Sequence, residues 1–334
     1  MPEALSLPPH RLSIVVPLYN EQDNVAPLAA RVHEALADYA NPWELILVDD
    51  GSSDGTLKHM LAAAKQYGDH VRPVELTRNF KQTAAMQAGV DAARGDVIVT
   101  MDGDLQNDPS DIPRLVSRLL HEELDLVAGW RQNRQDAVVM RKIPSRIANR
   151  LIAKMTGVRL NDYGCSLKAF RASVLKNIRL YGEMHRFIPA WLATVTSSRR
   201  ISEEPVKHHP RVAGQSKYGI SRTFRVILDL IAVYFFMCYR SRPGHFFGGI
   251  GLALGAVSTA ILAWLAWVKF GLGENVGTRP LLLFGVGGMI ASVHFITTGV
   301  LSEIMARIYF ESGSARPYWA RPTPQLADDD GWRG

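Results

Sequence analysis

Three oxygen-bearing side chains follow one apolar run of the sequence at alternate positions. Asp102, Asp104 and Gln106 come directly after residues 96–101, DVIVTM, a composition typical of a buried strand. Clustered oxygen ligands of this kind suit Mg²⁺ or Mn²⁺, which can bridge protein carboxylates to a diphosphate. An Asp-Gly pair can also serve only to form a turn. The acidic ends of the other predicted strands favour the metal site over this alternative.

Acidic residues also follow the first two apolar runs of the chain. Glu21 comes after residues 12–19 and Asp50 ends residues 44–50. Carboxylates at these places could accept hydrogen bonds from the base or ribose of a nucleotide. The sequence has neither a GxGxxG nor a GxxxxGK[ST] phosphate-binding loop. A bound cation is therefore the predicted means of holding the phosphates.

Short apolar runs alternate with stretches in which Ala, Leu and Val recur at helical spacing. The predicted strands are residues 12–19, 44–50, 72–77, 96–102 and 124–130, and the predicted helices include residues 25–40, 56–67 and 82–94. This alternation predicts an α/β fold with a largely parallel, doubly wound sheet. Ligands of such sheets bind at the carboxyl ends of the strands, where the acidic residues lie.

Charge is distributed unevenly along the 334 residues, although the net charge is only +6. Residues 1–130 hold 10 Lys and Arg against 20 Asp and Glu, whereas residues 131–334 hold 28 against 12. Residues 131–150 alone have six basic residues and one acidic residue. A charge run is commonly a solvated helix face, but this one precedes membrane-directed segments, which favours anionic phosphate or lipid headgroups as partners. Nucleic acid is not an expected partner, because the first part of the chain is acidic.

Composition excludes several classes of protein. With 47% hydrophobic and 21% charged residues, the chain is neither disordered nor of low complexity. Cys165 and Cys238 are too few for a disulfide scaffold or a cysteine-based zinc site. A reducing compartment is expected.

Two uncharged apolar segments near the end of the chain predict a transmembrane hairpin. Phe246–Val268 and Leu281–Leu301 are each long enough to cross a bilayer core of roughly 30 Å as a helix. The alternative is a pair of buried helices in a soluble domain. No signal peptide is recognisable at the N-terminus, and basic residues flank the hairpin more densely than they occupy its loop. We expect a multi-pass protein of the cytoplasmic (inner) membrane, with the catalytic region and the tail in the cytoplasm.

The segment before the first span, residues 224–239, is apolar with charged margins, which is typical of a helix lying in the membrane interface. The predicted organisation is a catalytic domain (1–223), a juxtamembrane amphipathic helix (224–242), two transmembrane helices (243–302) and a C-terminal tail (303–334). Glycines at positions 244, 248, 251 and 255 would let another helix approach closely. That helix could belong to the same hairpin or to a second copy in a homo-oligomer.

Ordered motifs from Leu12 to Tyr318 resemble a known family. VVPLYNE (15–21), VDDGSSDGT (48–56), LTRNFKQTAAMQAG (76–89) and MDGDLQNDP (101–109) are similar to the motifs of the inverting glycosyltransferase family 2, which has a GT-A fold. Later motifs resemble its polyprenyl-phosphate subgroup, which contains dolichyl-phosphate mannose synthase and bactoprenol glucosyltransferase. These motifs are GWR (129–131), RKIPSRIAN (141–149), NDYGCSLKAFR (161–171), YGEMHRFIP (181–189), HHPRVAGQSKYGISRT (208–223) and EIMARIYFE (303–311). The fold implied is a mixed α/β sheet of GT-A type.

The resemblance implies a role for each matching residue. The donor nucleotide sugar, UDP- or GDP-linked, would be bound by Pro17, Tyr19, Glu21, Asp50 and Asp102. The metal would be bound by Asp102, Asp104 and Gln106. The acceptor, a polyprenyl phosphate, would be bound by Arg131, Arg141, Ser145, Arg211, Ser216 and Lys217. Lys81 departs from the pattern, because many relatives have Gly after Asn-Phe.

Asp102, Asp104 and Arg131 are the expected catalytic residues. A phosphate monoester is already largely anionic at neutral pH, so it needs little or no general base. We expect the metal to neutralise the departing nucleoside diphosphate while arginines hold the attacking phosphate in line. Direct displacement would invert the anomeric centre. A Gln-x-x-Arg-Trp element of processive synthases is absent from the sequence, which favours a single transfer.

Two other functions remain open from the sequence. The chain could be a catalytically inactive membrane-anchored scaffold, or a nucleotidyltransferase that releases pyrophosphate. The donor base, the sugar and the lipid chain length are also open, since UDP-glucose, GDP-mannose, UDP-N-acetylhexosamine and modified pentose donors all fit.

Overall fold

The computed structural model describes residues 7–132, 153, 156–180, 184–210, 235, 239 and 242–312. The chain divides into two compact units, Met1–Asp229 and Leu230–Gly334, and each is described by itself. Five of the expected acceptor-site residues lie outside the described residues, as does most of the expected interfacial helix 224–242. These five are Arg141, Ser145, Arg211, Ser216 and Lys217.

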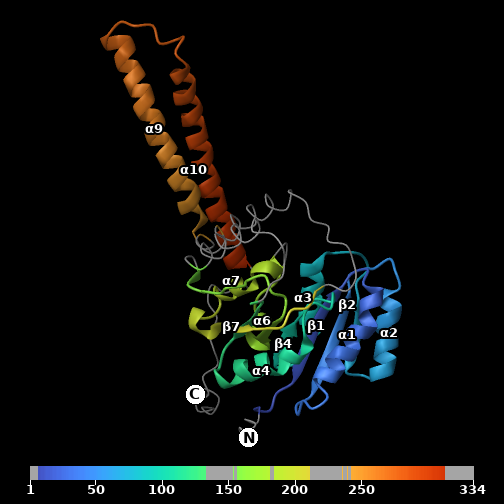
Figure 1. Ribbon diagram of the computed structural model, residues 1–334. Helices are drawn as coiled ribbons and strands as arrows, with labels where there is room; N and C mark the ends of the chain where they lie inside the picture. Colours follow the sequence, from blue (N-terminus) through green and yellow to red (C-terminus); the bar gives the residue numbers. More distant parts are fainter. Residues whose placement is uncertain are drawn as a thin grey trace, which may run out of the picture. The chain divides into compact units, whose positions relative to one another are not determined.

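The first unit is built on a seven-stranded mixed sheet with the order β3-β2-β1-β4-β6-β5-β7 (Figure 1). The strands are β1 (Leu12–Leu18), β2 (Trp43–Asp49), β3 (Val71–Glu75), β4 (Val97–Thr100), β5 (Leu126–Trp130), β6 (Lys168–Arg171) and β7 (Ile201–Pro205). All pairs are parallel except the two that β6 makes with β4 and β5. The carboxyl ends of β4 and β5 therefore lie at the same edge as those of β1 and β2.

Helices cover both faces of the sheet. The longer ones are α1 (Gln22–Ala35), α2 (Thr56–Tyr67), α3 (Gln82–Ala92) and α4 (Ile112–His121). Shorter helices follow at η1 (Pro109–Asp111), α6 (Ala172–Leu175), η2 (Met184–Phe187), α7 (Ile188–Leu192) and η3 (Ser198–Arg200). Ile14 and Val16 share one hydrophobic core with residues of α1, α2 and α4. Val15 points to the other face, where a Cβ atom added to Gly89 of α3 would lie 2.3 Å from it.

All five predicted strands form, and the predicted helices correspond to α1, α2 and α3. The expectation of a GT-A-type mixed sheet is confirmed. Helix α4 and strands β6 and β7 were not among the predicted elements. Strand β6 has only four residues and a buried lysine, so its sequence lacks the long apolar run that marks the other strands.

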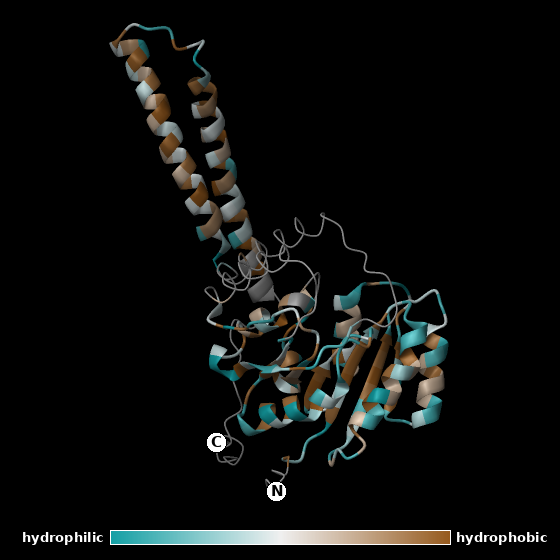
Figure 2. Ribbon diagram, in the orientation of Figure 1, coloured by the Kyte–Doolittle hydropathy of each residue, from teal (hydrophilic) through white to brown (hydrophobic). Residues whose placement is uncertain are grey.

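The second unit contains two long helices, α9 (Pro243–Gly271) and α10 (Pro280–Ser312), which lie side by side (Figure 1). Both are long and apolar enough to cross a membrane. They expose large apolar side chains along their length, among them Trp264, Trp267 and Phe284. In Figure 2 the ribbon of both helices is coloured mostly from white to brown, the hydrophobic end of the scale. Such surfaces are unfavourable in water, which suggests that the hairpin is a membrane anchor.

Small residues bring α9 and α10 close together. The hydroxyl of Ser292 donates a hydrogen bond of 2.6 Å to the carbonyl oxygen of Gly251. A Cβ atom at Gly251 would lie 2.7 Å from Cγ1 of Ile296, and one at Gly255 would lie 2.7 Å from Oγ of Ser292. Gly251 and Gly255 are thus accounted for by packing within the hairpin, whereas a Cβ atom at Gly248 would meet nothing within 4 Å.

Candidate active site

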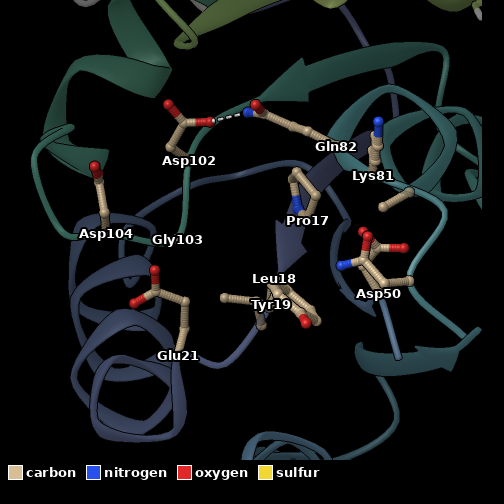
Figure 3. A pocket seen from close by; sticks show the side chains of 12 residues that line it. Pro17, Leu18, Tyr19, Glu21, Asp50, Lys81, Gln82, Asp102, Gly103 and Asp104 are labelled. Atoms are coloured by element: carbon tan, nitrogen blue, oxygen red, sulfur yellow. Dashed lines mark hydrogen bonds between the residues drawn. The ribbon is translucent and has the colours of Figure 1, made fainter. Parts of the chain in front are cut away.

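A cavity of about 440 Å³ lies at the carboxyl edge of the sheet (Figure 3). Residues from four consecutive βα junctions line it. They are Pro17, Leu18, Tyr19, Glu21, Asp50, Asn79, Lys81, Gln82, Ala85, Asp102, Gly103 and Asp104. The cavity therefore brings together all five residues expected to bind the donor, together with Asp104.

Hydrogen bonds join the loops after β1 and β2, which form one wall of the cavity. Asn20 has a positive φ of 55°, its backbone N–H donates to Oγ of Ser52, and its side-chain oxygen accepts from the N–H of Ser53. The N–H of Glu21 donates to Oγ1 of Thr56 over 2.9 Å. The polar residues of these two loops therefore fix the positions of Glu21 and Asp50.

Asp50 is buried and is held by the loop that follows β3. One carboxylate oxygen accepts a 2.7 Å hydrogen bond from the N–H of Phe80, and the N–H of Lys81 donates to the same side chain. Burial raises the pKa of Asp50, against the effect of these two hydrogen bonds, and the neighbouring charge of Asp49 raises it further. The carboxylate thus reaches the cavity with part of its hydrogen-bonding capacity already used.

Lys81 has an unusual backbone conformation at the start of α3. Its φ is 74° and its ψ is 162°, a region that is almost reserved for glycine. This explains why Gly is the expected residue after Asn-Phe, and it means that Lys81 is strained. Its side chain is exposed at the cavity.

The loop after β4 carries the two aspartates that were expected to bind metal. Gly103 stands between them because a Cβ atom there would lie 2.3 Å from Cδ2 of Leu18. The side chain of Gln82 donates a 2.8 Å hydrogen bond to Asp102 (Figure 3). In the view of Figure 3, Asp102 and Asp104 lie on one side of Pro17, and Asp50 and Lys81 lie on the other.

Burial raises the pKa of Asp102, and the charge of Asp104 raises it further. Two carboxylates that repel each other at a cavity are a fitting donor set for a hard divalent cation. Mg²⁺ commonly takes one or two protein carboxylates and completes its shell with water and substrate phosphate oxygens. Within the described residues no group of three or more His, Cys, Asp or Glu side chains could hold a metal ion, so substrate oxygens or water would have to complete the shell.

Gln106, the third expected metal ligand, does not line the cavity. Its backbone N–H donates to Asp104 over 3.2 Å, and its side-chain nitrogen lies 3.5 Å from the carbonyl oxygen of His209. The N–H of His209 donates in return to the carbonyl oxygen of Gln106. Gln106 thus joins the aspartate loop to the segment that follows β7.

Arg131 follows β5 and is held by Asp162, a residue that the sequence reasoning did not single out. Nε of Arg131 lies 2.7 Å from Oδ2 of Asp162, and Nη2 lies 3.0 Å from Oδ1. Both side chains are 14% exposed. Burial opposes the charged form of each, but the paired charges and hydrogen bonds raise the pKa of Arg131 and lower that of Asp162. A guanidinium has five N–H donors, so Arg131 keeps others for a phosphate.

The antiparallel strand β6 sets the separation between the two halves of the site. Neighbouring strands lie roughly 4.8 Å apart, so β4 and β5, with β6 between them, are separated by about 10 Å. Asp102 follows β4 and Arg131 follows β5, and their charges influence each other. The residues that precede β6, including Asp162, arrive at this same edge.

A second missed residue is Lys168, the first residue of β6. Its ammonium group is buried and contacts the carbonyl oxygen of Cys165. Burial lowers its pKa, while the charges of Cys165, Asp162 and Asp102 act in the opposite direction. The available signal was a lysine between Leu167 and Ala169-Phe170 in the motif NDYGCSLKAFR.

Comparisons with known proteins match most of the chain to one family of enzymes. Residues 13–179 match the model of "Glycosyl transferase family 2". The chain is 57% identical over 318 residues to the dodecaprenyl-phosphate galacturonate synthase of Rhizobium johnstonii, covering 95% of this chain and 93% of that protein. It is 36% identical over 307 residues to the undecaprenyl-phosphate 4-deoxy-4-formamido-L-arabinose transferase of Klebsiella pneumoniae, covering 91% of each.

Solved structures share the fold at low sequence identity. Glucosyl-3-phosphoglycerate synthase from Mycobacterium tuberculosis, in complex with Mn²⁺, uridine-diphosphate-glucose and phosphoglyceric acid, has a TM-score of 0.51 and 20% identity, covering 69% of this chain and 80% of that one. Mannosyl-3-phosphoglycerate synthase from Rubrobacter xylanophilus has a TM-score of 0.53 and 14% identity, covering 68% and 74%.

Proposed function

The chain belongs to glycosyl transferase family 2 and, within it, to the polyprenyl-phosphate glycosyltransferases, and from this we propose that it transfers one sugar from a nucleotide sugar to a polyprenyl phosphate. The observation that carries the proposal is the placing of the aspartate pair and Arg131 at one sheet edge. We take the sugar to be a hexuronic acid such as galacturonate, because the 57% identical relative is named for that product.

The nucleotide half of the donor fits the side of the cavity formed by the loops after β1 and β2. Tyr19 is 47% exposed and offers an aromatic face to a base. Asp50 and Glu21 offer carboxylate oxygens to N–H and O–H groups of the nucleoside. The diphosphate would then lie toward Asp102 and Asp104.

A divalent cation, Mg²⁺ or Mn²⁺, is the proposed cofactor at this end of the cavity. Asp102 and Asp104 would hold it, and when bound it supplies positive charge where the nucleoside diphosphate departs. Gln82 fixes the orientation of Asp102 through its hydrogen bond.

Arg131 is the proposed ligand of the acceptor phosphate. Its bidentate pair with Asp162 fixes the plane of the guanidinium, and its remaining N–H groups can bind phosphate oxygens. The phosphate monoester is itself an anionic nucleophile, so the site needs to orient it and not to deprotonate it. Attack at the sugar carbon opposite the departing diphosphate would invert that centre. The five acceptor-site residues outside the described chain stay expectations from the family resemblance.

The polyprenyl chain requires a membrane, which the hairpin of α9 and α10 suits. We place the protein in the cytoplasmic membrane with the catalytic unit on the cytoplasmic side, since basic residues flank the hairpin. A homo-oligomer through the transmembrane helices stays an expectation from the sequence.

The test uses the full-length chain in lipid vesicles with undecaprenyl phosphate and Mg²⁺. A panel of UDP-galacturonate, UDP-glucuronate, UDP-galactose, UDP-glucose and GDP-mannose is supplied in turn, and both the lipid product and the released nucleotide are identified. We expect a uronic acid to be transferred to the lipid with release of nucleoside diphosphate, and EDTA to stop the reaction reversibly. Release of pyrophosphate, or no transfer from any donor, would overturn the proposal; transfer of a neutral sugar alone would overturn only the sugar assignment.

A further inference from the structure

Lys81 stands out among the cavity residues because of its charge. The described residues that line the cavity include four carboxylates, those of Glu21, Asp50, Asp102 and Asp104. Lys81 is the only basic residue in this described lining. A nucleotide sugar brings two further negative charges on its diphosphate. A cation inside the cavity therefore changes the electrostatics of donor binding more than one elsewhere on the surface.

The Lys81 side chain contributes little to the stability of the fold. It is exposed, and among the described residues it forms no ion pair. Its backbone conformation, with φ 74° and ψ 162°, is one that glycine adopts without strain and lysine does not. Strain of this kind tends to be found at functional sites, where the side chain contributes something other than packing.

The position of Lys81 limits what its side chain can reach. Its own N–H donates to Asp50, and the next residue, Gln82, donates to Asp102. The Lys81 backbone is therefore bonded to the residue at the nucleoside end and is linked to the aspartate pair through its neighbour Gln82. From there a four-carbon stem can carry an ammonium group to the middle of the cavity, where a diphosphate would join the two ends.

We propose that Lys81 is a donor-binding residue whose ammonium group contacts the diphosphate of the nucleotide sugar. The inference rests on the proposed function for the identity of the donor, but it concerns the part of the donor that all nucleotide sugars share. It accounts for a lysine at a position where the backbone favours glycine. It also accounts for how an acidic cavity accepts an anionic ligand.

Binding measurements without an acceptor test the inference separately from the reaction. UDP and uridine are titrated by calorimetry into the full-length protein with Mg²⁺ present. For Lys81→Met we expect the Kd of UDP to rise about 10-fold, the loss of one charge-assisted contact, while the affinity for uridine changes less than about 2-fold. Lys81→Arg should keep most of the UDP affinity. Arg78→Ala removes an exposed cation from the same loop that stacks on Phe80 and does not line the cavity, so it should leave both affinities unchanged.

Lys81→Gly distinguishes the effect of the side-chain charge from the effect of the strained backbone conformation. It should lose UDP affinity as Lys81→Met does, while its Tm is no lower than that of the wild type, because glycine relieves the positive φ. An equal loss of UDP and uridine affinity in Lys81→Met would assign the side chain to the nucleoside and overturn the proposal. Unchanged UDP affinity would overturn it as well.

Kinetics with two donors test whether Lys81 instead contacts the sugar carboxylate, which is the other anionic group of UDP-galacturonate. Lys81→Met should raise the KM for UDP-galacturonate and for UDP-galactose by the same factor, where both are substrates. A rise confined to UDP-galacturonate would mean that Lys81 reads the sugar carboxylate, which contradicts the proposal. If the wild type binds UDP but transfers no sugar, the proposed function fails while the assignment of Lys81 is still decided by the titrations.

Discussion

Arg131 is positioned before any substrate arrives. Asp162 holds it through two hydrogen bonds, and both side chains are largely shielded from water. An arginine held in this way loses little conformational entropy when a phosphate binds to its free N–H groups. In the proposed mechanism Asp162 is a positioning residue that acts through Arg131.

Replacing Asp162 tests this role. Asp162→Asn should raise the KM for polyprenyl phosphate by about 10-fold and leave the KM of the donor unchanged, because the arginine keeps its charge and loses its orientation. Breaking a partly buried ion pair should also lower the free energy of unfolding by about 3 kcal/mol. Steady-state kinetics with each substrate varied, and thermal unfolding in detergent, give both values. A change in the donor KM alone would show that Arg131 serves the donor.

Asp104 is expected to be indispensable for a different reason. Asp104→Asn keeps the size of the side chain but removes a charge from the pair that would hold the cation, so transfer should fall by at least roughly 100-fold. Transfer of labelled sugar to lipid measures the loss. Asp91→Asn is the matched control, because Asp91 is an exposed aspartate on α3 bonded only locally to Gln87. Wild-type turnover in Asp104→Asn would remove Asp104 from the mechanism.

Among the elements, β2 carries a half-buried carboxylate that bonds to both neighbouring strands. Glu44 accepts hydrogen bonds from the hydroxyl of Ser13 on β1, from the N–H of Arg94 and from the guanidinium of Arg72 on β3. Burial alone would raise the pKa of Glu44, but these hydrogen bonds and the charge of Arg72 lower it overall. The ionised form therefore stabilises the sheet at the end opposite the active site.

The lowered pKa of Glu44 predicts the sign of a pH effect. A carboxyl group whose pKa is lowered on folding contributes stability above its unfolded pKa of about 4.3, and this contribution is lost as pH falls through the folded value. Glu44→Gln should lower the free energy of unfolding by about 1–3 kcal/mol at pH 7 and flatten its decline below about pH 5. Urea unfolding from pH 3 to 7 measures both. Glu34→Gln, at an exposed carboxylate of α1, should change neither.

Strands β1 to β5 were predictable from the sequence, whereas β6 and β7 were missed. Polar residues after β1, β2 and β4 share an edge because parallel strands run in the same direction, so the sequence was enough to group Glu21, Asp50 and Asp102. Asp162 and Lys168 reach the same edge only because β6 inserts between β4 and β5 in reverse. Neither the length nor the hydrophobic periodicity of β6 indicates that insertion.

Gly251 and Gly249 of α9 form a matched pair with which the packing of the hairpin can be tested. Gly251→Ala would place a Cβ atom 2.7 Å from Ile296 and 3.0 Å from the carbonyl oxygen of Ser292, so it should lower hairpin stability by about 1–2 kcal/mol. Gly249→Ala meets nothing within 4 Å and should be neutral or mildly stabilising, since alanine favours a helix. Thermal unfolding in detergent compares the two. Equal effects would mean that α9 and α10 do not pack through this face.

For the whole molecule, the acidic part of the sequence (residues 1–130) and the basic part (residues 131–334) are expected to carry different tasks. The acidic first part of the chain supplies the cavity, while the later basic part supplies Arg131 and the residues around the hairpin. The net charge of +6 is the sum of the charges of these two parts. We expect the acidic part to bind its anionic substrate through cations and the basic part to bind anions directly.

Cysteine labelling tests the proposed membrane topology. Asn275→Cys, in the loop between α9 and α10, should react with a membrane-impermeant maleimide in intact cells with a permeabilised outer membrane. Lys58→Cys, exposed on α2, should react only after the inner membrane is opened. The wild-type chain controls for Cys165 and Cys238. Labelling of Lys58→Cys in intact cells would invert the topology.

The reversed strand β6 also bears on how the chain folds. Strands β4 and β5 are synthesised well before β6, and the sheet between them cannot close until residues 168–171 have left the ribosome. Until then each presents an unpaired edge, and closing the gap requires contacts between distant parts of the sequence, which fold slowly. The sheet that supports the active site is therefore completed only after β6 has been synthesised, and until then the open edges of β4 and β5 are exposed to aggregation.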